Sequence, residues 1–363
     1  MGMMMKNILS TKVVLAIFAI VALAVCCWQL GKTRTSQIGQ VKNSCQITIT
    51  DSMNRKVTIP YPVRSVAVIN PYTAELITAI GAAENIKGID LEIYSNRNAF
   101  PVKFTDKMII GGRGESQINF EKLIKLNPQV LIIDGGRHVD KIEKIVGLFG
   151  IKVIVLKADS SICFFNNCKL LGEIFNKEKE AEKLSNYIGY WCEYVNSHLK
   201  NVTPKRVYFE CRRPNRAVIP GEFFNEMLRP AHAINIFSDS KSIYVSPEYI
   251  VLRNPEFIVR LSDIRDPYSC FPPTKERFKS IENEIKDRAC WDYIDAVQND
   301  KIFIYSYYSH GGAGKLIGSF YLAKYMYPEL LPELDPEKIF KTWMTEYQKI
   351  PYQSGHTYQS EAR

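Results

Sequence analysis

The chain has 363 residues, of which 46% are hydrophobic and 23% are charged, and its formal net charge is +9. A chain of this length exceeds one small core and is long enough for two lobes. Its Lys and Arg residues form no block with interleaved aromatic residues, so the composition excludes nucleic acid as an expected partner.

Residues 1–34 have the features of an export signal or a membrane anchor. Lys6 and Lys12 precede an apolar run at 13–28, and polar residues follow it. The polar stretch that continues through 35–44 is expected to act as a linker. The sequence therefore predicts an exported protein that is tethered to the outer face of the cytoplasmic membrane, at the cell surface or in the periplasm.

Two kinds of tether fit the apolar run. Residues 23–26, Leu-Ala-Val-Cys, resemble the lipobox of bacterial lipoproteins, in which Cys26 would carry the lipid. Val25 departs from the small residue, usually Gly or Ala, that precedes the cysteine in that motif. The run also approaches the length of an uncleaved helical anchor, so both alternatives stay open.

With Cys26 and Cys27 set aside, the cysteines show no pattern of a zinc site. No CxxC pair occurs among them, and an odd number leaves at least one unpaired. The pairs Cys163–Cys168 and Cys270–Cys290 are local candidates for disulfides in an exported protein, but their spacing does not establish either bond. The seven residues are Cys45, Cys163, Cys168, Cys192, Cys211, Cys270 and Cys290.

The segment 45–160 alternates strands and helices as in a doubly wound α/β lobe. A hairpin opens it, because residues 47–51 and 56–60 read as strands on either side of a turn at Asn54 and Arg55. The pattern further predicts strands at 64–69, 85–90, 107–113 and 152–156, and helices at 73–81 and 139–149.

The segment 161–203 interrupts this alternation. It is rich in Glu, Lys, Leu and Tyr, with apolar residues at helical spacing, and predicts two helices that meet near Asn176 and connect the lobes. Strands and helices alternate again in a second lobe at 204–352, with a final helical stretch from Leu316. Residues 353–363 are expected to form a tail.

One sequence motif, called the repeated phrase below, occurs in both lobes, at 119–133 and at 246–259. Each copy has a Glu in a first helical turn, an apolar stretch, an Asn-Pro stop and a β-branched run. The two acidic residues, Glu121 and Glu248, suit the positive end of the helix dipole. The repeat predicts two lobes of similar plan, although helix–Pro–strand units recur in many α/β proteins.

A series of short motifs follows this plan in a fixed order. They are Ile47-Thr-Ile-Thr-Asp51 with Arg55 and Val57, Pro62-Val-Arg64-Ser-Val, Pro71-Tyr-Thr-Ala-Glu75, Ala79-Ile-Gly81, Gly111-Gly112, Asn119-Phe-Glu121 with Leu126-Asn-Pro128, and Tyr321-Leu-Ala-Lys-Tyr-Met-Tyr327-Pro-Glu. In this order the chain, over about 45–352, resembles the substrate-binding proteins of ABC importers for iron–siderophore complexes, haem, cobalamin and related metal chelates.

The resemblance implies a fold, partners and two contact residues. Two Rossmann-like α/β lobes are joined by a single long interlobe helix, and the ligand sits in the cleft between them. A monomer is expected to deliver its ligand to a permease dimer with a cytoplasmic ATPase. Glu121 and Glu248 match the residues that dock into arginines of the permease, and a carboxylate exposed at a helix start suits that contact.

The loops that leave the strands should line the cleft. Arginines there suit an anionic ligand, tyrosines can stack on its flat organic parts, and a neutral histidine can ligate iron or cobalt. Each of these side chains can also be an ordinary loop or structural residue. The candidate ligand-binding residues are Tyr72, Arg113, Arg137, His138, Arg213, Tyr307, Tyr308 and His310.

The ligand expected from the resemblance is an iron- or cobalt-containing chelate, with no prosthetic group and no resident metal. An enzyme is not expected, because the chain has no GxSxG elbow, no HExxH motif and no acidic cluster at metal-site spacing. The glycine-rich run at 311–316 lacks the spacing and the Ser or Thr of a phosphate loop. The remaining alternatives are a binding protein for a free metal ion or an oxyanion such as molybdate, and an exported α/β enzyme.

Overall fold

The computed structural model describes residues 45–158, 160–266, 268–308, 313 and 315–361. The predicted export segment with Cys26, the linker at 35–44 and His310 lie outside these residues. Internal contacts separate 1–45 from 46–363, and the second unit contains the elements described below. Within the described ranges, no helix is both long and apolar enough to cross a membrane.

The predicted hairpin forms from β1 (Gln46–Thr50) and β2 (Lys56–Pro60), which pair antiparallel. The buried carboxylate of Asp51 organises the turn, since it accepts hydrogen bonds from the backbone N–H groups of Met53 (2.9 Å) and Arg55 (3.0 Å). The Arg55 guanidinium pairs with the same carboxylate at 2.6 Å. Asp51 also accepts from the N–H of Val155 at 3.1 Å, which ties the hairpin to the N-terminal sheet.

The N-terminal sheet has four parallel strands in the order β4-β3-β5-β6. They are β3 (Val66–Val68), β4 (Ile86–Ile89), β5 (Val130–Ile133) and β6 (Lys152–Val155). Val66 and Val68 belong to one core cluster and Ala67 to another, so both faces of the sheet are buried, as in a doubly wound fold. The helices are α2 (Pro71–Ala79), α3 (Leu91–Ser95), α4 (Phe120–Leu126) and α5 (Val139–Val146).

The strand predicted at 107–113 is wrong. Asp106–Met108 form a 3₁₀ turn, and only isolated bridges follow, Ile89 to Ile109 and Gly111 to Ile118. The chain folds back on itself here, and the backbone of Gly111 passes so close to Gln117 that an added Cβ would lie 2.2 Å from its carbonyl oxygen. A glycine permits this close approach, which ends the pairing.

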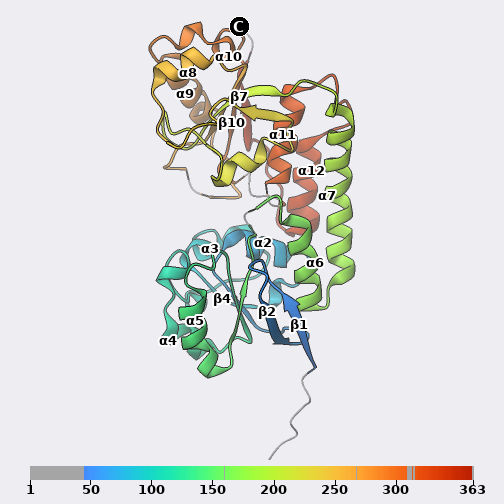
Figure 1. Ribbon diagram of the computed structural model, residues 1–363. Helices are drawn as coiled ribbons and strands as arrows, with labels where there is room; N and C mark the ends of the chain where they lie inside the picture. Colours follow the sequence, from blue (N-terminus) through green and yellow to red (C-terminus); the bar gives the residue numbers. More distant parts are fainter. Residues whose placement is uncertain (1–44, 159, 267, 309–312, 314, 362–363) are drawn as a thin grey trace, which may run out of the picture. The chain divides into compact units, whose positions relative to one another are not determined.

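Two helices connect the sheets, α6 (Phe164–Phe175) and α7 (Glu178–Leu199). They meet at Asn176, which is left-handed (φ 56°), so the predicted break is confirmed. Gly172 lets them approach, because a Cβ there would lie 2.9 Å from the Cβ of Ala181. The 22-residue helix α7 packs against α6 and α11 and is seen along one side of Figure 1.

The C-terminal sheet has the order β11-β10-β9-β7-β8, in which only β11 is antiparallel. Its strands are β7 (Lys205–Glu210), β8 (Ala233–Asn235), β9 (Phe257–Leu261), β10 (Ile302–Tyr305) and β11 (Thr357–Gln359). The predicted tail at 353–363 thus contributes an edge strand. The helices are α8 (Pro247–Arg253), α9 (Lys275–Lys286), α10 (Asp295–Gln298), α11 (Leu316–Met326) and α12 (Pro336–Thr342).

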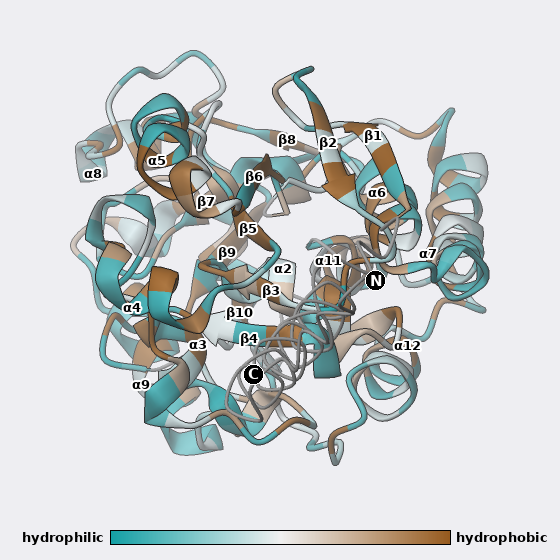
Figure 2. Cartoon of the chain, turned by 90° about the horizontal axis from the view of Figure 1, so that it is seen from below, coloured by the Kyte–Doolittle hydropathy of each residue, from teal (hydrophilic) through white to brown (hydrophobic). Residues whose placement is uncertain are grey.

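Hydropathy follows this layered arrangement. In Figure 2 the strands β5 and β6 are hydrophobic, whereas a helix such as α5 has one hydrophobic and one hydrophilic side. The hydrophobic side of α5 consists of Val139, Ile142 and Val146, at the spacing of one helix face.

A charged cluster is buried between the C-terminal sheet and its helices. The carboxylate of Glu210, at the end of β7, is fully buried and accepts hydrogen bonds from Arg260 (2.7 Å), from Arg288 (2.8 and 2.9 Å) and from the hydroxyl of Tyr208 (3.0 Å). It also accepts from the N–H of Asn215 at 2.7 Å, which fixes the loop that follows β7. Arg288 also donates to Glu284 at 2.9 Å, so the two guanidinium groups are matched by two carboxylates.

We expect Glu210→Ala to destabilise the protein by roughly 3–5 kcal/mol, because it leaves the guanidinium of Arg260 buried without its carboxylate partner. Urea unfolding of the variant and the wild type measures this difference. Glu182→Ala, at an exposed position of α7, is the matched control and should change stability little. A loss below about 1 kcal/mol for Glu210→Ala would contradict the role of the cluster.

Candidate functional site

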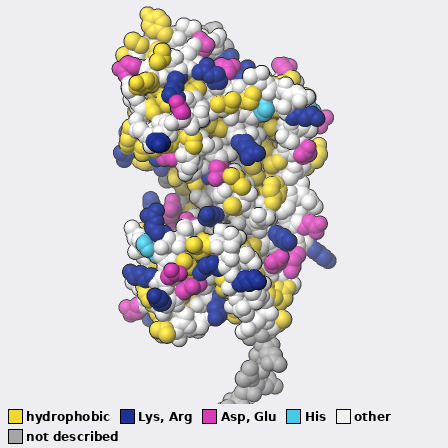
Figure 3. All heavy atoms as spheres, viewed as in Figure 1, with side chains coloured by type: hydrophobic (Ala, Val, Ile, Leu, Met, Phe, Trp, Pro, Cys, Tyr) yellow, Lys and Arg dark blue, Asp and Glu magenta, His cyan; other side chains and the backbone are white. Residues whose placement is uncertain are grey.

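The loops at the carboxyl ends of the parallel strands carry most of the predicted ligand-binding residues. In a parallel sheet these loops gather at one edge. Tyr72 follows β3, Arg137 and His138 follow β5, Arg213 follows β7, and Tyr307 and Tyr308 follow β10. Figure 3 shows the surface hollowed between the parts that carry the two sheets, on the side away from α7, with Lys or Arg side chains at its rim.

Asn70 positions Tyr72 at the start of α2. Its side-chain oxygen accepts hydrogen bonds from the N–H groups of Tyr72 (2.8 Å) and Thr73 (3.2 Å), which caps the helix. Its amide nitrogen donates to Asp134 at 2.8 Å, so the loops after β3 and β5 are held together.

Aromatic rings from both lobes meet between the two sheets. The ring of Tyr72 lies 5.3 Å from Phe223 and 5.9 Å from Tyr268, measured between centroids. Tyr268 in turn lies 5.7 Å from Tyr307 and 5.1 Å from Tyr308. The structure therefore brings together three predicted residues, Tyr72, Tyr307 and Tyr308, and adds two that the sequence prediction did not include. We call these five residues the aromatic cluster.

A buried hydrogen bond between the lobes anchors this cluster. The hydroxyl of Tyr268 donates to the carboxyl group of Glu75 in α2, and both side chains are buried. The side chain of Gln348 donates to the backbone oxygen of Glu75 at 2.9 Å. Burial raises the pKa of Glu75 to about 8, although the bond from Tyr268 acts in the opposite direction. Glu75 is therefore largely neutral at pH 7.

Two cationic side chains pack against the aromatic cluster. The guanidinium of Arg212 lies 3.9 Å from the ring centroid of Tyr307 and donates to the backbone oxygens of Asp263 and Ile264, both at 2.9 Å. The ammonium group of Lys315 lies 3.3 Å from the ring centroid of Phe223. Such contacts between a cation and a ring face are favourable, and they concentrate positive charge at this edge of the sheet.

Arg113, in the N-terminal lobe, has an exposed side chain. Burial raises the pKa of Tyr307 in the C-terminal lobe, and the positive charge of Arg212 acts in the opposite direction.

The other predicted ligand residues have no described contact with the aromatic cluster. Arg137 and His138 are exposed in a loop that Glu115 holds, by accepting from the N–H groups of Gly136 (2.6 Å) and His138 (3.2 Å). Arg213 is exposed beside Arg212. Tyr308 belongs to the cluster but is only 1% exposed.

The repeated phrase forms the same unit in each lobe. Glu121 and Glu248 are exposed residues in the first turns of α4 and α8. Each helix ends at a left-handed Asn, Asn127 or Asn254, before a proline and a buried strand. The Asn119 side chain caps α4, by accepting from Lys122 N–H at 2.9 Å. The Ser246 hydroxyl instead donates to the Glu248 carboxylate, and this bond lowers the pKa of Glu248.

Both helices lie on the side of the described unit opposite α7, as Figures 1 and 2 show from two directions. The glutamates of the two lobes are therefore presented away from the connector. An exposed carboxylate at a helix start can form charge-assisted hydrogen bonds with a cationic partner.

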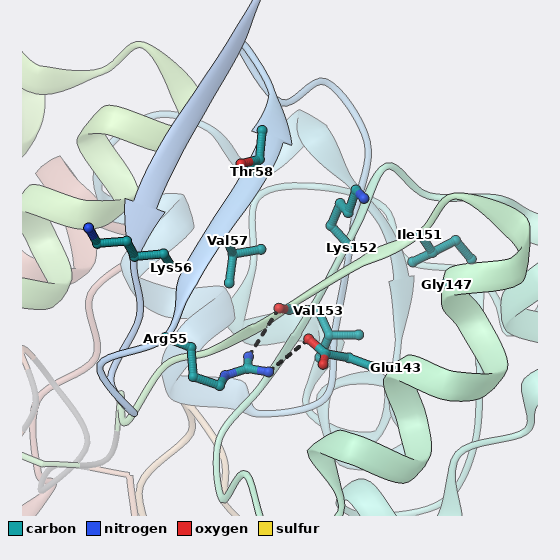
Figure 4. A pocket seen from close by; sticks show the side chains of 9 residues that line it. All are labelled: Arg55, Lys56, Val57, Thr58, Glu143, Gly147, Ile151, Lys152 and Val153. Carbon is teal, nitrogen blue, oxygen red and sulfur yellow. Dashed lines mark hydrogen bonds and ion pairs between the residues drawn. The ribbon is translucent and has the colours of Figure 1, made fainter.

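Cavities elsewhere have different linings. One of about 460 Å³ lies between the hairpin and α5 (Figure 4), but its Arg55 is already paired with Glu143 at 2.7 Å and with Asp51. A larger one, of about 660 Å³, lies beside Glu248. In the part of the chain that the structure describes, no group of three His, Cys, Asp or Glu side chains is placed to hold a metal ion, and all seven cysteines there are free thiols.

Comparisons with known proteins agree with this architecture. A family model described as periplasmic binding protein matches residues 66–308. The chain is 22% identical to the uncharacterised ABC transporter substrate-binding lipoprotein YvrC of Bacillus subtilis, over 85% of the chain and 94% of that protein. It is 20% identical to the molybdate-binding protein MolA of Haemophilus influenzae, over 84% and 91%. The crystal structure of the TroA-like periplasmic binding protein FepB from Veillonella parvula has a similar fold (TM-score 0.73, 20% identity, 87% and 100% coverage).

The buried Glu75 carboxyl predicts a specific pH dependence of stability. Its pKa is raised on folding, so the stabilisation that it contributes is complete below about 4.5 and is lost as pH rises through about 8. In Glu75→Gln the side chain stays neutral and its oxygen can still accept from Tyr268. We expect the unfolding free energy of the wild type to fall relative to that of Glu75→Gln by on the order of 4 kcal/mol between pH 5 and 9. If the unfolding free energies of the wild type and of Glu75→Gln, measured in urea, change with pH in the same way, Glu75 does not titrate as described.

Proposed function

The chain belongs to the periplasmic binding protein family, and from this premise we propose that it is the extracytoplasmic receptor of an ABC importer for a metal chelate. Proteins of this family bind solutes and are not enzymes, and the likeness to YvrC supports the role of a substrate-binding protein of an ABC transporter. We further propose that the chelate contains iron or cobalt and is carried as the transported ligand, not as a prosthetic group.

The aromatic cluster is the observation that carries the choice of ligand. Rings from both lobes offer faces and edges to the flat organic parts of a chelate, and such contacts add to the free energy of burying them. Arg212 supplies positive charge at the same place, which suits an anionic siderophore or the propionates of haem. Arg113, exposed in the N-terminal lobe, would add a second positive charge to the ligand site. The ligand would thus contact both lobes and favour the arrangement that holds them together.

The transport cycle also requires an attachment to the membrane and a contact with the permease. We infer that the N-terminal segment, as a lipid-modified Cys26 or an uncleaved helix, keeps the protein at the outer face of the cytoplasmic membrane. The receptor would meet a permease dimer, driven by a cytoplasmic ATPase, as a monomer. Glu121 and Glu248, one on each lobe, would engage arginines of the permease and set the orientation of the receptor on it.

A second candidate ligand is an oxyanion such as molybdate. The similarity to MolA favours an oxyanion. The positive charges of Arg212 and Lys315 also favour it, because they would attract any anion, whether or not it has a flat organic part. The two candidates differ in what they require of the aromatic cluster, because a small oxyanion has no flat surface for the rings to cover.

We expect the protein without residues 1–34 to bind at least one ferric siderophore, haemin or cobalamin with saturable quenching of its intrinsic fluorescence. Tyr307→Ala should weaken that binding about tenfold, because it removes a stacking surface and the ring beneath Arg212. Binding of molybdate alone, unaffected by loss of the Tyr72 ring, would favour the second candidate. No binding of any chelate or oxyanion would overturn the receptor assignment.

Glu121→Ala and Glu248→Ala should each reduce uptake into proteoliposomes that contain the permease and its ATPase by about tenfold or more, because each removes a charge-assisted contact. Their affinity for the ligand should stay within about twofold of wild type, since both residues are exposed away from the aromatic cluster. Glu182→Ala, on the opposite side in α7, is the charge-matched control. Loss of ligand affinity would place the two glutamates in the ligand site instead.

A further inference from the structure

The turn between α5 and β6 carries two large hydrophobic side chains that the protein does not bury. Leu148 is 85% exposed, the highest fraction among the large hydrophobic side chains that the structure describes, and Phe149 is 51% exposed. All four residues of 147–150 are exposed, whereas Val146 and Ile151 on either side are buried. Scattered single hydrophobic side chains are ordinary on a surface, but an adjacent pair on one turn is typical of a contact site.

The backbone of the turn holds this pair at the surface. The N–H of Gly150 donates to the carbonyl oxygen of Gly147 at 3.0 Å, and the N–H of Ile151 donates to that of Val146 at 3.3 Å. Gly150 is left-handed (φ 77°), a conformation that glycine adopts without strain. The two hydrophobic side chains are therefore presented by a closed turn with buried residues on both sides.

Basic side chains flank the turn. Lys144 lies in the last turn of α5 and Lys152 is the first residue of β6, so an exposed lysine precedes the hydrophobic pair and another follows it. Lys152 also lines the cavity between the hairpin and α5, as does the exposed Lys56 (Figure 4). The carboxylate in that lining, Glu143, is paired with Arg55 at 2.7 Å. The surface around the turn is therefore hydrophobic at its tip and positive at its base.

The turn lies at the end of the N-terminal lobe where the chain enters it. It precedes β6 and so lies at the amino edge of the parallel sheet, opposite the carboxyl edge that carries Tyr72 of the aromatic cluster. The start of β1, at Gln46, is seen at the same end of this lobe as α5 in Figure 1. Residues 29–44 can reach at most about 55 Å when fully extended, so a membrane anchor before them would keep this end near the bilayer.

We propose that Leu148 and Phe149 insert into the surface of an anionic membrane, while Lys144 and Lys152 contact its phosphate headgroups. The apolar side chains gain by leaving water, and each lysine near an anionic surface strengthens the association about fivefold. The carboxyl edge of the N-terminal sheet then faces away from the bilayer, open to a ligand from the medium. The inference rests on the proposed membrane tether and adds to it the orientation of the receptor before docking.

The test uses the full-length chain in lipid nanodiscs without the permease, made either of phosphatidylcholine alone or of equal parts of phosphatidylcholine and phosphatidylglycerol. Oxidation by hydroxyl radicals, measured by peptide mass spectrometry, reports how accessible each side chain is. Leu148 and Phe149 should be oxidised about fivefold more slowly in the anionic nanodiscs than in the neutral ones. Leu252, which is 77% exposed in α8 of the C-terminal lobe, is the matched control and should be oxidised at the same rate in both.

A pair of charge variants tests the role of the lysines. Lys144→Gln combined with Lys152→Gln should abolish the protection, because it removes the attraction to the headgroups and leaves the hydrophobic pair unchanged. Lys169→Gln combined with Lys183→Gln removes the same charge from exposed positions of α6 and α7, and this control should keep the protection.

The outcomes separate this inference from the proposed function. Equal oxidation rates of Leu148 in the two kinds of nanodisc would overturn it, because slow rates in both indicate a contact that does not depend on lipid charge, such as a second copy of this chain, and fast rates in both indicate a free surface. The receptor role stands in either case. If the nanodiscs do not retain the full-length chain at all, the proposed tether itself fails.

Discussion

The hydrogen bond that Tyr268 donates to the buried carboxyl group of Glu75 joins a loop of the C-terminal sheet to a helix of the N-terminal sheet. A carboxyl group in such surroundings is costly to bury unless it is neutral and hydrogen-bonded, so the bond constrains both partners. Tyr268 in turn contacts the rings of Tyr72 and Tyr307, one from each lobe. This buried bond therefore fixes the rings of the proposed ligand site, together with the contact between Tyr72 and Phe223.

The second constraint is the buried Glu210, which holds the loop 211–216 through the N–H of Asn215. Arg212, near one end of this loop, lies over Tyr307 in the aromatic cluster, and Asn215, near the other, lines the cavity beside Glu248. The proposed ligand contact of Arg212 and the wall of this cavity thus fall on one short segment.

The architecture and family predicted from the sequence are confirmed, since two α/β lobes form and the family model covers 66–308. The hairpin and the repeated units were predictable because period-2 alternation and Asn-Pro stops are local signals. The absence of a regular strand at 107–113 was not predictable, because an apolar run does not show that the chain folds back after an isolated bridge. Tyr268 was missed because its partner lies 193 residues away, and no local pattern encodes such a contact. The docking glutamates remain predictions.

The location of the bound metal tests the central claim most directly. A crystal of the complex with a ferric siderophore or haemin, measured at the iron absorption edge, gives an anomalous peak at the iron atom. The account predicts a single peak between the two sheets, with the chelate against Tyr72, Phe223 and Tyr307 and its anionic groups toward Arg113 and Arg212. A peak at the hairpin cavity, or on the outer surface of one lobe away from the aromatic cluster, would contradict it.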